Sequence, residues 1–118
     1  LTEGEILFIS GTASIVGHRT LHPDDVLGQT RETLANLEAL IAEANQVIDQ
    51  RMFDPSRLVY RVYVRHAADM PVIREELKRL SGNKTNAVFL QANICREDLL
   101  LEIEATAFSC ALGSVDRQ

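Results

Sequence analysis

The sequence predicts a single α+β domain, in which a mixed β-sheet carries two helices packed on one face. Two segments repeat apolar residues at helical spacing, and the segments around them are rich in β-branched and aromatic residues. A chain of 118 residues is long enough for one hydrophobic core without disulfide or metal support. We therefore expect residues 1–118 to form one domain.

The first half of the chain contains one strand segment and the clearest helix. The stretch EILFIS, 5–10, predicts a short buried strand, and GTASIVG continues it past Gly11. Pro23, with Asp24 and Asp25 beside it, favours a helix start, and the helix should run to about residue 48. Its apolar residues at helical spacing are Leu34, Leu37, Leu40, Ile41 and Ala44.

The second half alternates strands with a shorter helix. The stretch RLVYRVYVR, 57–65, predicts a strand with an apolar face at its even positions. A helix over 69–83 should begin at Asp69, which is a plausible cap, and end at Gly82. Strands over 86–94 and 99–110 complete the sheet. The charged residues of the second helix predict a solvated face made of Arg74, Glu75, Glu76, Lys78 and Arg79.

If both helices cover the apolar sides of the strands, the opposite face of the sheet stays uncovered. Either water or a partner subunit could lie against this face, and we expect a partner because apolar residues adjoin it. The polar residues predicted on it are Arg61, Tyr63, Arg65, Glu102 and Glu104.

Composition disfavours several classes of function. The net charge is −5 and no basic block is present, so we expect no nucleic-acid partner. No apolar run approaches the ~20 residues that span a bilayer, so we expect no membrane partner and a cytoplasmic protein. Cys95 and Cys110 form neither a disulfide framework nor a metal-ligand spacing. We expect no metal and no cofactor.

The order of the elements, and the terminal EIEA after a short connection that contains an aspartate, resemble the RidA family, also called YjgF or L-PSP. The resemblance spans nearly the whole chain. It implies a chorismate-mutase-like fold and a homotrimer with ligand clefts between subunits. Imine-deaminating RidA proteins carry an arginine fifteen positions before the first Glu of EIE, and that position is Ala87 here. The deaminase interpretation is therefore disfavoured.

The stretches ISGTASIVGHRTLHPDDVLGQTRETLANLEALI, LVYRVYVR and LQANICREDLLLEIEA are similar to the C-terminal part of the chorismatases. That similarity implies hydrolysis of the enolpyruvyl ether of chorismate, which releases pyruvate and a dihydroxycyclohexadiene carboxylate or a hydroxybenzoate. This sequence would be the final third of such a protein, as a fragment or as a stand-alone relative. The alternative is a non-catalytic domain that binds a small carboxylate or serves assembly. Whether the chain is an enzyme depends on the cleft being complete.

Glu102 is the candidate catalytic residue. Hydrolysis of an enol ether needs an acid that protonates the methylene carbon and then faces the resulting cation as a carboxylate. Such an acid must keep its proton near neutral pH, which requires a cleft shielded from water. The resemblance to chorismatases assigns this role to Glu102, and the alternative is a cross-strand salt bridge with Arg61 or Arg65. Glu104 is predicted to be an ion-pair partner on the same face.

Substrate-binding candidates come from four segments. By resemblance, Thr12, Ala13 and Ser14 line the pocket, although Gly11 alone is equally consistent with a strand bend. Cys95 either adjoins the reacting ring or is an ordinary small buried residue. Chorismate is a dianion, so its cleft needs cations. Arg61, with Tyr63 beside it, is the predicted cation; Arg65 and His18 are weaker candidates, and Arg61 as a mere partner of Glu102 is the alternative.

Overall fold

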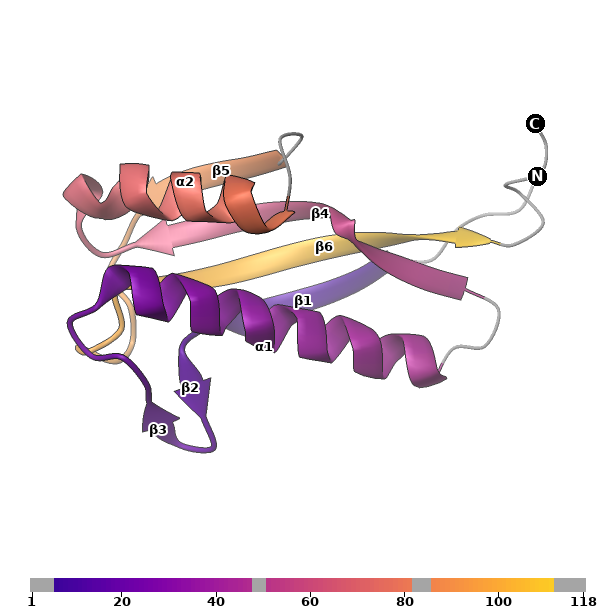
Figure 1. Cartoon of the computed structure of the whole chain (residues 1–118), viewed down its shortest axis with the longest axis horizontal. Helices are drawn as coiled ribbons and strands as arrows, with labels where there is room; N and C mark the ends of the chain where they lie inside the picture. The colour runs from indigo at the N-terminus through magenta and orange to yellow at the C-terminus, as the bar shows by residue number, and fades with distance from the viewer. Residues whose placement is uncertain (1–5, 48–50, 82–85, 112–118) are drawn as a thin grey trace.

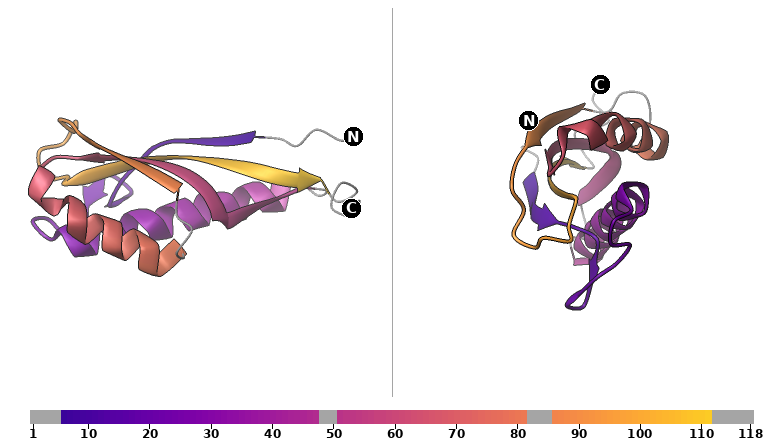
Figure 2. Two further views of the ribbon diagram at one scale, coloured as in Figure 1. Left: turned by 90° about the horizontal axis from the view of Figure 1, so that it is seen from above. Right: turned by 90° about the vertical axis from the view of Figure 1, so that its left-hand side faces the viewer.

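The computed structural model describes residues 6–47, 51–81 and 86–111, with side chains for 6–46, 58–80 and 86–107. Its main sheet has four strands in the order β1-β6-β4-β5 (Figure 1). Both helices pack on one face of this sheet, as the view from above shows (Figure 2). The predicted α+β architecture is therefore confirmed. The bounds are β1 Ile6–Thr12, α1 Val26–Val47, β4 Arg51–Val64, α2 Met70–Ser81, β5 Asn86–Gln91 and β6 Leu101–Ala111.

The sheet is mixed because it contains both antiparallel and parallel strand pairs. Strand β6 lies in the centre and pairs antiparallel with both β1 and β4, whereas β5 pairs parallel with β4. A parallel pair needs a crossover connection, and helix α2 supplies it. The pairing of β1 with β6 is irregular between Ile9 and Thr12, which places a break in the ladder beside Gly11.

Helix α1 begins three residues later than Pro23. His22 and Asp24 have positive φ angles of 57° and 64°, so the segment before the helix is a turn. The side chain of Asp25 accepts a hydrogen bond from the backbone N–H of Gly28 at 3.0 Å, which satisfies an otherwise unpaired amide of the first helical turn. The aspartate thus supplies the helix start that the sequence predicted.

Residues 13–20 do not continue the first strand, contrary to expectation. They form a separate small hairpin of β2 (Ile15–Val16) and β3 (Arg19–Thr20), which projects from the body of the molecule (Figure 1). Gly17, at the tip, has a φ of +64°, a conformation that L residues rarely adopt. Ser14 is fully buried and its hydroxyl donates to the carbonyl of Leu21 at 2.8 Å, which closes the hairpin at its base.

The core lies between the sheet and the two helices. The even positions of β4 and the odd positions of β6 face it, as their alternation predicted. Helix α1 contributes Leu34, Leu37 and Ile41, and helix α2 contributes Ile73 and Leu77. None of the helices among the described residues is long and apolar enough to cross a membrane.

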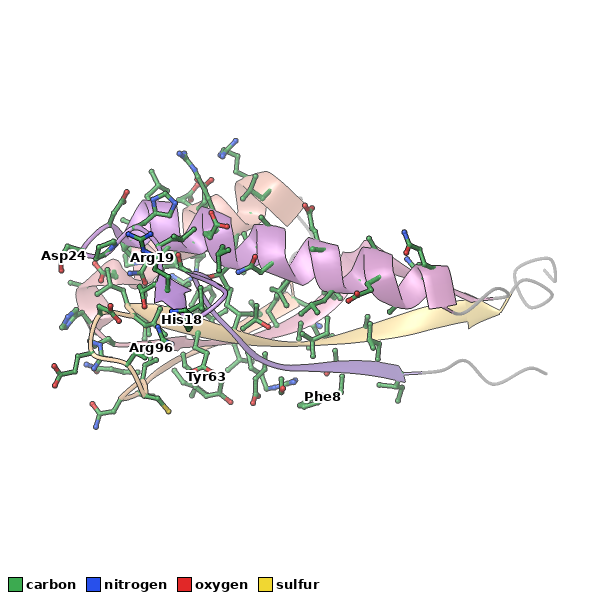
Figure 3. All side chains as sticks on the ribbon, turned by 90° about the horizontal axis from the view of Figure 1, so that it is seen from below. Phe8, His18, Arg19, Asp24, Tyr63 and Arg96 are labelled. Carbon is green, nitrogen blue, oxygen red and sulfur yellow. The ribbon has the colours of Figure 1, made fainter. Side chains whose placement is uncertain are left out.

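The other face of the sheet is uncovered, as expected. Phe8 and Tyr63 project from it on the side away from the helices (Figure 3). Phe8 is 58% exposed although it is aromatic, and its ring lies 5.2 Å from the guanidinium carbon of Arg61. Besides Phe8, the large apolar residues of β1 and β5 that are exposed are Ile6, Val88 and Leu90.

The prediction of a solvated charged face on the second helix is wrong for Glu76. This side chain is buried, with only 5% of its surface exposed. It accepts hydrogen bonds from Arg31 of α1, at 2.8 Å, and from Arg79 on its own helix. These hydrogen bonds, from Arg79 first and then Arg31, lower the pKa of Glu76 from 4.5 to about 2. A buried carboxylate is retained here because two guanidinium groups surround it.

Candidate active-site pocket

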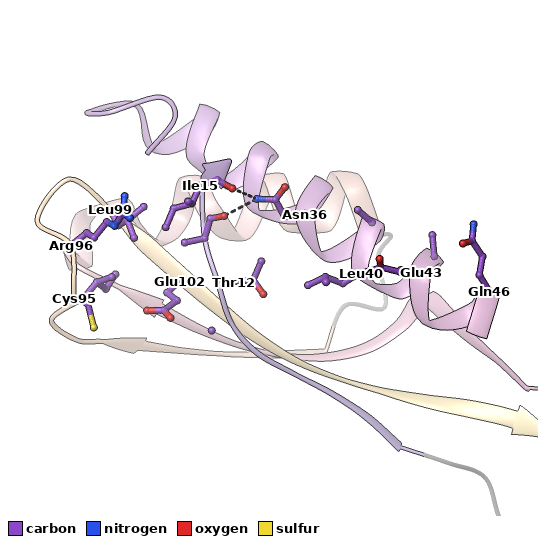
Figure 4. Close-up of a pocket in the computed structure, with 15 residues that line it drawn as sticks. Thr12, Ile15, Asn36, Leu40, Glu43, Gln46, Cys95, Arg96, Leu99 and Glu102 are labelled. Atoms are coloured by element: carbon purple, nitrogen blue, oxygen red, sulfur yellow. Dashed lines mark hydrogen bonds between the residues drawn. The ribbon is translucent and has the colours of Figure 1, made fainter. Parts of the chain in front are cut away.

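One pocket of about 880 Å³ opens between helix α1, the end of β1 and the connection that precedes β6 (Figure 4). Asn36 of α1 holds one wall in place: its amide donates to the carbonyls of Ala13 and Ile15 at 2.9 and 3.1 Å. The pocket has both polar and apolar lining, as small-ligand sites usually do. The ionisable groups of its described lining are Glu43, Cys95, Arg96 and Glu102.

Glu102 lies on the wall of this pocket, and its carboxylate sits directly against the backbone of Gly11. A Cβ atom placed on residue 11 would overlap the Glu102 carboxylate. The absence of a side chain at Gly11 therefore makes room for the acid. In the described part of the chain, no hydrogen bond or ion pair holds this carboxylate. The salt bridge of Glu102 with Arg61 or Arg65, the alternative to its catalytic role, is thus not formed.

Arg61 pairs instead with Glu104, which makes Glu104 the ion-pair partner that the sequence predicted. The Arg61 Nε donates to Glu104 Oε1 at 3.0 Å, and the Tyr63 hydroxyl donates to the same oxygen at 3.0 Å. The hydrogen bond from Arg61, followed by that from Tyr63, lowers the pKa of Glu104. The hydrogen bond to Glu104 raises the pKa of Tyr63 in turn. These three side chains lie on the uncovered face and do not line the pocket.

Arg65 has a structural environment that the sequence did not indicate. Its guanidinium donates to three backbone carbonyls, those of Ile94, Arg96 and Leu99, at 2.7–2.9 Å. Arg96 reaches the pocket wall, and one of its amino groups donates to the carbonyl of His18 and the hydroxyl of Thr20. The His18 side chain is exposed on the projecting hairpin.

The remaining predicted residues divide between the pocket and the core. Thr12, Ala13 and Cys95 line the pocket, with Cys95 exposed, whereas Ser14 is buried at the base of the hairpin. Ala87 packs against the hydrophobic core, and the neighbouring Val88 faces the uncovered side. The side chain of Cys110 lies outside the described side chains.

The sequence patterns did not single out two side-chain amides of α1, those of the buried Gln29 and the half-buried Asn36. Gln29 is fully buried: its amide donates to the carbonyls of His22 and Asp98, and its oxygen accepts from the backbone N–H of Leu100. Asn36 makes the two bonds described above. Both residues lie on α1 among apolar neighbours at helical spacing, so the only signal was a polar residue on a helix face otherwise expected to be buried.

Two relatives from Streptomyces hygroscopicus share sequence with this chain. A 3-hydroxybenzoate synthase is 36% identical over 104 residues, covering 86% of this chain and 31% of the relative. A chorismatase is 39% identical over 107 residues, covering 86% of this chain and 30% of the relative. The chain thus spans about a third of the length of these relatives. No family model matches the sequence.

Solved structures give the same picture of the fold. A chorismatase crystal structure superposes with a TM-score of 0.78 at 37% identity, covering 86% of this chain and 32% of that one. A Rid-family protein of unknown function from Yersinia pestis, YyfB, superposes with a TM-score of 0.71 at 26% identity, covering 89% and 79%. The chain therefore has the RidA/YjgF fold, and it is homologous to chorismatases over part of their length.

Proposed function

We propose that this chain, a RidA/YjgF-fold protein homologous to chorismatases, forms the acid-bearing wall of a site that hydrolyses the enolpyruvyl ether of chorismate. Glu102 is the proton donor in this proposal. The observation that carries it is the position of Glu102: a carboxylate without an ion-pair partner in the described chain, seated over Gly11 at the edge of a pocket that Cys95 and Thr12 also line. The sequence identity with chorismatase supports the choice of substrate.

The reaction requires one carboxyl group that first donates a proton and then faces the resulting cation as a carboxylate. Protonated Glu102 gives its proton to the methylene carbon of the enolpyruvyl group, which leaves an oxocarbenium-like carbon beside the new carboxylate. Water adds to that carbon and releases a proton, and the hemiketal then breaks into pyruvate and the ring alcohol. The residues beside the ring decide between a cyclohexadiene product and an aromatic one, and we place Cys95 and Ala13 among them.

A single chain supplies too little positive charge for this substrate. The described pocket carries one guanidinium, Arg96, and two carboxyl groups, Glu43 and Glu102, of which the mechanism needs Glu102 protonated. A dianion needs cationic partners. We therefore propose that a second copy, in a homotrimer, or a further part of a longer chain completes the cleft over the uncovered face. Arg61 and Tyr63 lie on that face, so they remain predicted substrate-binding residues of the completed cleft.

The second candidate is a domain that binds a small carboxylate, or that assembles with copies of itself, without catalysis. The same charge balance favours it, since the pocket of one chain cannot neutralise chorismate. An imine deaminase remains disfavoured on the sequence, because β5, residues 86–91, contains no arginine.

The test is release of pyruvate from chorismate by the wild-type chain, by Glu102→Gln and by Glu38→Gln. Glu38 is an exposed carboxylate on α1 away from the pocket, and it controls for the loss of one charge. We expect a loss of kcat of about 10²-fold or more in Glu102→Gln and none in Glu38→Gln. Equal rates in all three would remove Glu102 from this role. Binding of chorismate without pyruvate from any of them would favour the second candidate.

A further inference from the structure

The connection of residues 92–100, between β5 and β6, forms part of the pocket wall without regular secondary structure of its own. It carries Ile94, Cys95, Arg96 and Leu99 to the pocket, and Glu102 follows two residues after its end. A segment of this kind has few backbone hydrogen bonds within itself, so its conformation depends on side chains from other elements. The side chains of Gln29 and Arg65 make five hydrogen bonds to the backbone of this segment.

Gln29 holds the C-terminal end of the connection. It is fully buried on α1, and its amide group bonds in both directions: the nitrogen donates to the carbonyl of Asp98 at 2.8 Å, and the oxygen accepts from the N–H of Leu100 at 2.7 Å. The same nitrogen donates to the carbonyl of His22 at 3.1 Å. The amide therefore joins the start of α1 to the residues immediately before β6.

Arg65 holds the connection from the opposite side. It follows directly after β4, and its guanidinium donates to the carbonyls of Ile94 and Leu99 at 2.9 Å and to that of Arg96 at 2.7 Å. Three carbonyls on one side chain need the planar, multiply donating guanidinium, and the single ammonium of lysine matches that geometry poorly. These bonds draw both ends of the 94–99 segment to one point.

We propose that Gln29 and Arg65 are positioning residues that clamp the 92–100 connection and so set where Cys95 and Glu102 stand in the pocket. Neither residue lines the pocket itself. The effect of the clamp on catalysis rests on the proposed function, but the clamp itself does not, and it can be measured without any substrate.

The substrate-free test is amide hydrogen exchange of the 92–100 segment, read by mass spectrometry, in wild type, Gln29→Met and Arg65→Lys. Methionine keeps the volume of glutamine and removes its hydrogen bonds. The matched control is Thr30→Val, which removes a buried hydroxyl whose hydrogen bond stays within α1, to the carbonyl of Val26 at 2.7 Å. We expect exchange about tenfold faster or more in both clamp variants. Thr30→Val should stay within about twofold of wild type.

Unchanged exchange in both clamp variants would overturn the proposal, and so would equal acceleration in Thr30→Val, because the effect would then be general loss of stability. The second readout is pyruvate release. With the clamp lost, we expect kcat to fall about tenfold while KM changes less, since misplacement of reacting groups acts mainly on the chemical step. The wild-type chain could also release no pyruvate while exchange is still faster in both clamp variants. That result would support the clamp and reject the proposed function. Faster exchange with an unaltered kcat would reject the positioning role.

Discussion

At the scale of single residues, the pocket depends on a glycine that leaves room for a carboxylate. Gly11 lies where the β1–β6 ladder is irregular, and the Glu102 carboxylate occupies the space that a Cβ atom would need. The carboxylate is the far end of a flexible side chain, so it can move aside when that space is filled. The packing thus constrains the position of the acid more than it constrains the fold.

Gly11→Ala should therefore impair the site and spare the fold. We expect the free energy of unfolding to change by less than about 1 kcal/mol, because Glu102 can rotate away from the new methyl group. We expect pyruvate release to fall about as far as in Glu102→Gln. Urea denaturation and the chorismate assay together measure both effects. Wild-type activity in the Gly11→Ala variant would show that the contact does not place the acid.

At the scale of elements, the two helices are joined by a buried ion cluster as well as by apolar packing. Glu76 of α2 accepts from Arg31 of α1 and from Arg79, and both arginines are more than half exposed. Burial of a carboxylate without such partners would be strongly destabilising. The charge pattern of α2 alone resembles a solvated surface, and only the neighbouring helix distinguishes Glu76 from Glu75.

The pKa of Glu76, about 2 against an ordinary 4.5, predicts a pH window for this contribution. Above about pH 4.5 the carboxylate is ionised in the folded and the unfolded chain, so its stabilising effect is complete. The effect is lost as the pH falls from about 4.5 towards 2, because the carboxyl group of Glu76 then binds a proton in the unfolded chain before it does so in the folded chain. This contribution to the free energy of unfolding is roughly 2–3 kcal/mol, a figure that already allows for the exposure of the two arginines.

We therefore expect Glu76→Gln to be less stable than wild type at pH 7 and to approach it at pH 3. Urea unfolding at pH 7, 4 and 3 measures the difference. Glu75→Gln, on the exposed neighbour, is the control and should show little change at any pH. A constant difference between Glu76→Gln and wild type across these values would contradict the assignment.

At the scale of the whole molecule, the sheet is covered on one side only. The uncovered face combines the Arg61–Glu104–Tyr63 cluster with exposed apolar residues, among which Phe8 is 58% exposed. The exposed apolar residues lie on the edge strands β1 and β5, on either side of this cluster. We expect a partner to cover them. The face also adjoins the pocket, since Glu102 lies on β6 two residues from Glu104.

We expect the chain to self-associate through this face, as a homotrimer, and Phe8→Lys to shift it towards monomer. A lysine at this position would remove apolar area and place a second positive charge beside Arg61, whose guanidinium lies 5.2 Å from the Phe8 ring. Light scattering after size-exclusion chromatography measures the mass. Val72→Lys, at an exposed position on α2, is the control. A monomeric wild type, or a Phe8→Lys protein of unchanged mass, would contradict this expectation.

Alternation and helical spacing were sufficient to predict much of this structure. The even positions of 57–65 and the odd positions of 101–107 face the core as predicted, because side-chain direction along a strand follows from the backbone itself. The start of α1 follows from the cap at Asp25, and the start of α2 at Met70 follows from the preference for a proline in the first turn; both preferences are local. Where a separate hairpin replaced the expected continuation of the first strand over residues 13–17, the cause is Gly17 at its tip and the buried hydroxyl of Ser14 at its base.

The partners of the charged side chains were decided by the tertiary structure. Sequence alone placed Arg61, Arg65, Glu102 and Glu104 on one face, but which of them pair depends on strand register and on the bulge beside Gly11. Likewise, the sequence shows Gln29 only as an ordinary helix residue. Its role depends on the connection before β6, which the fold places against it. Local patterns determine which way a side chain points; what it meets there is determined by segments distant in the chain, which only the assembled fold brings within hydrogen-bonding distance.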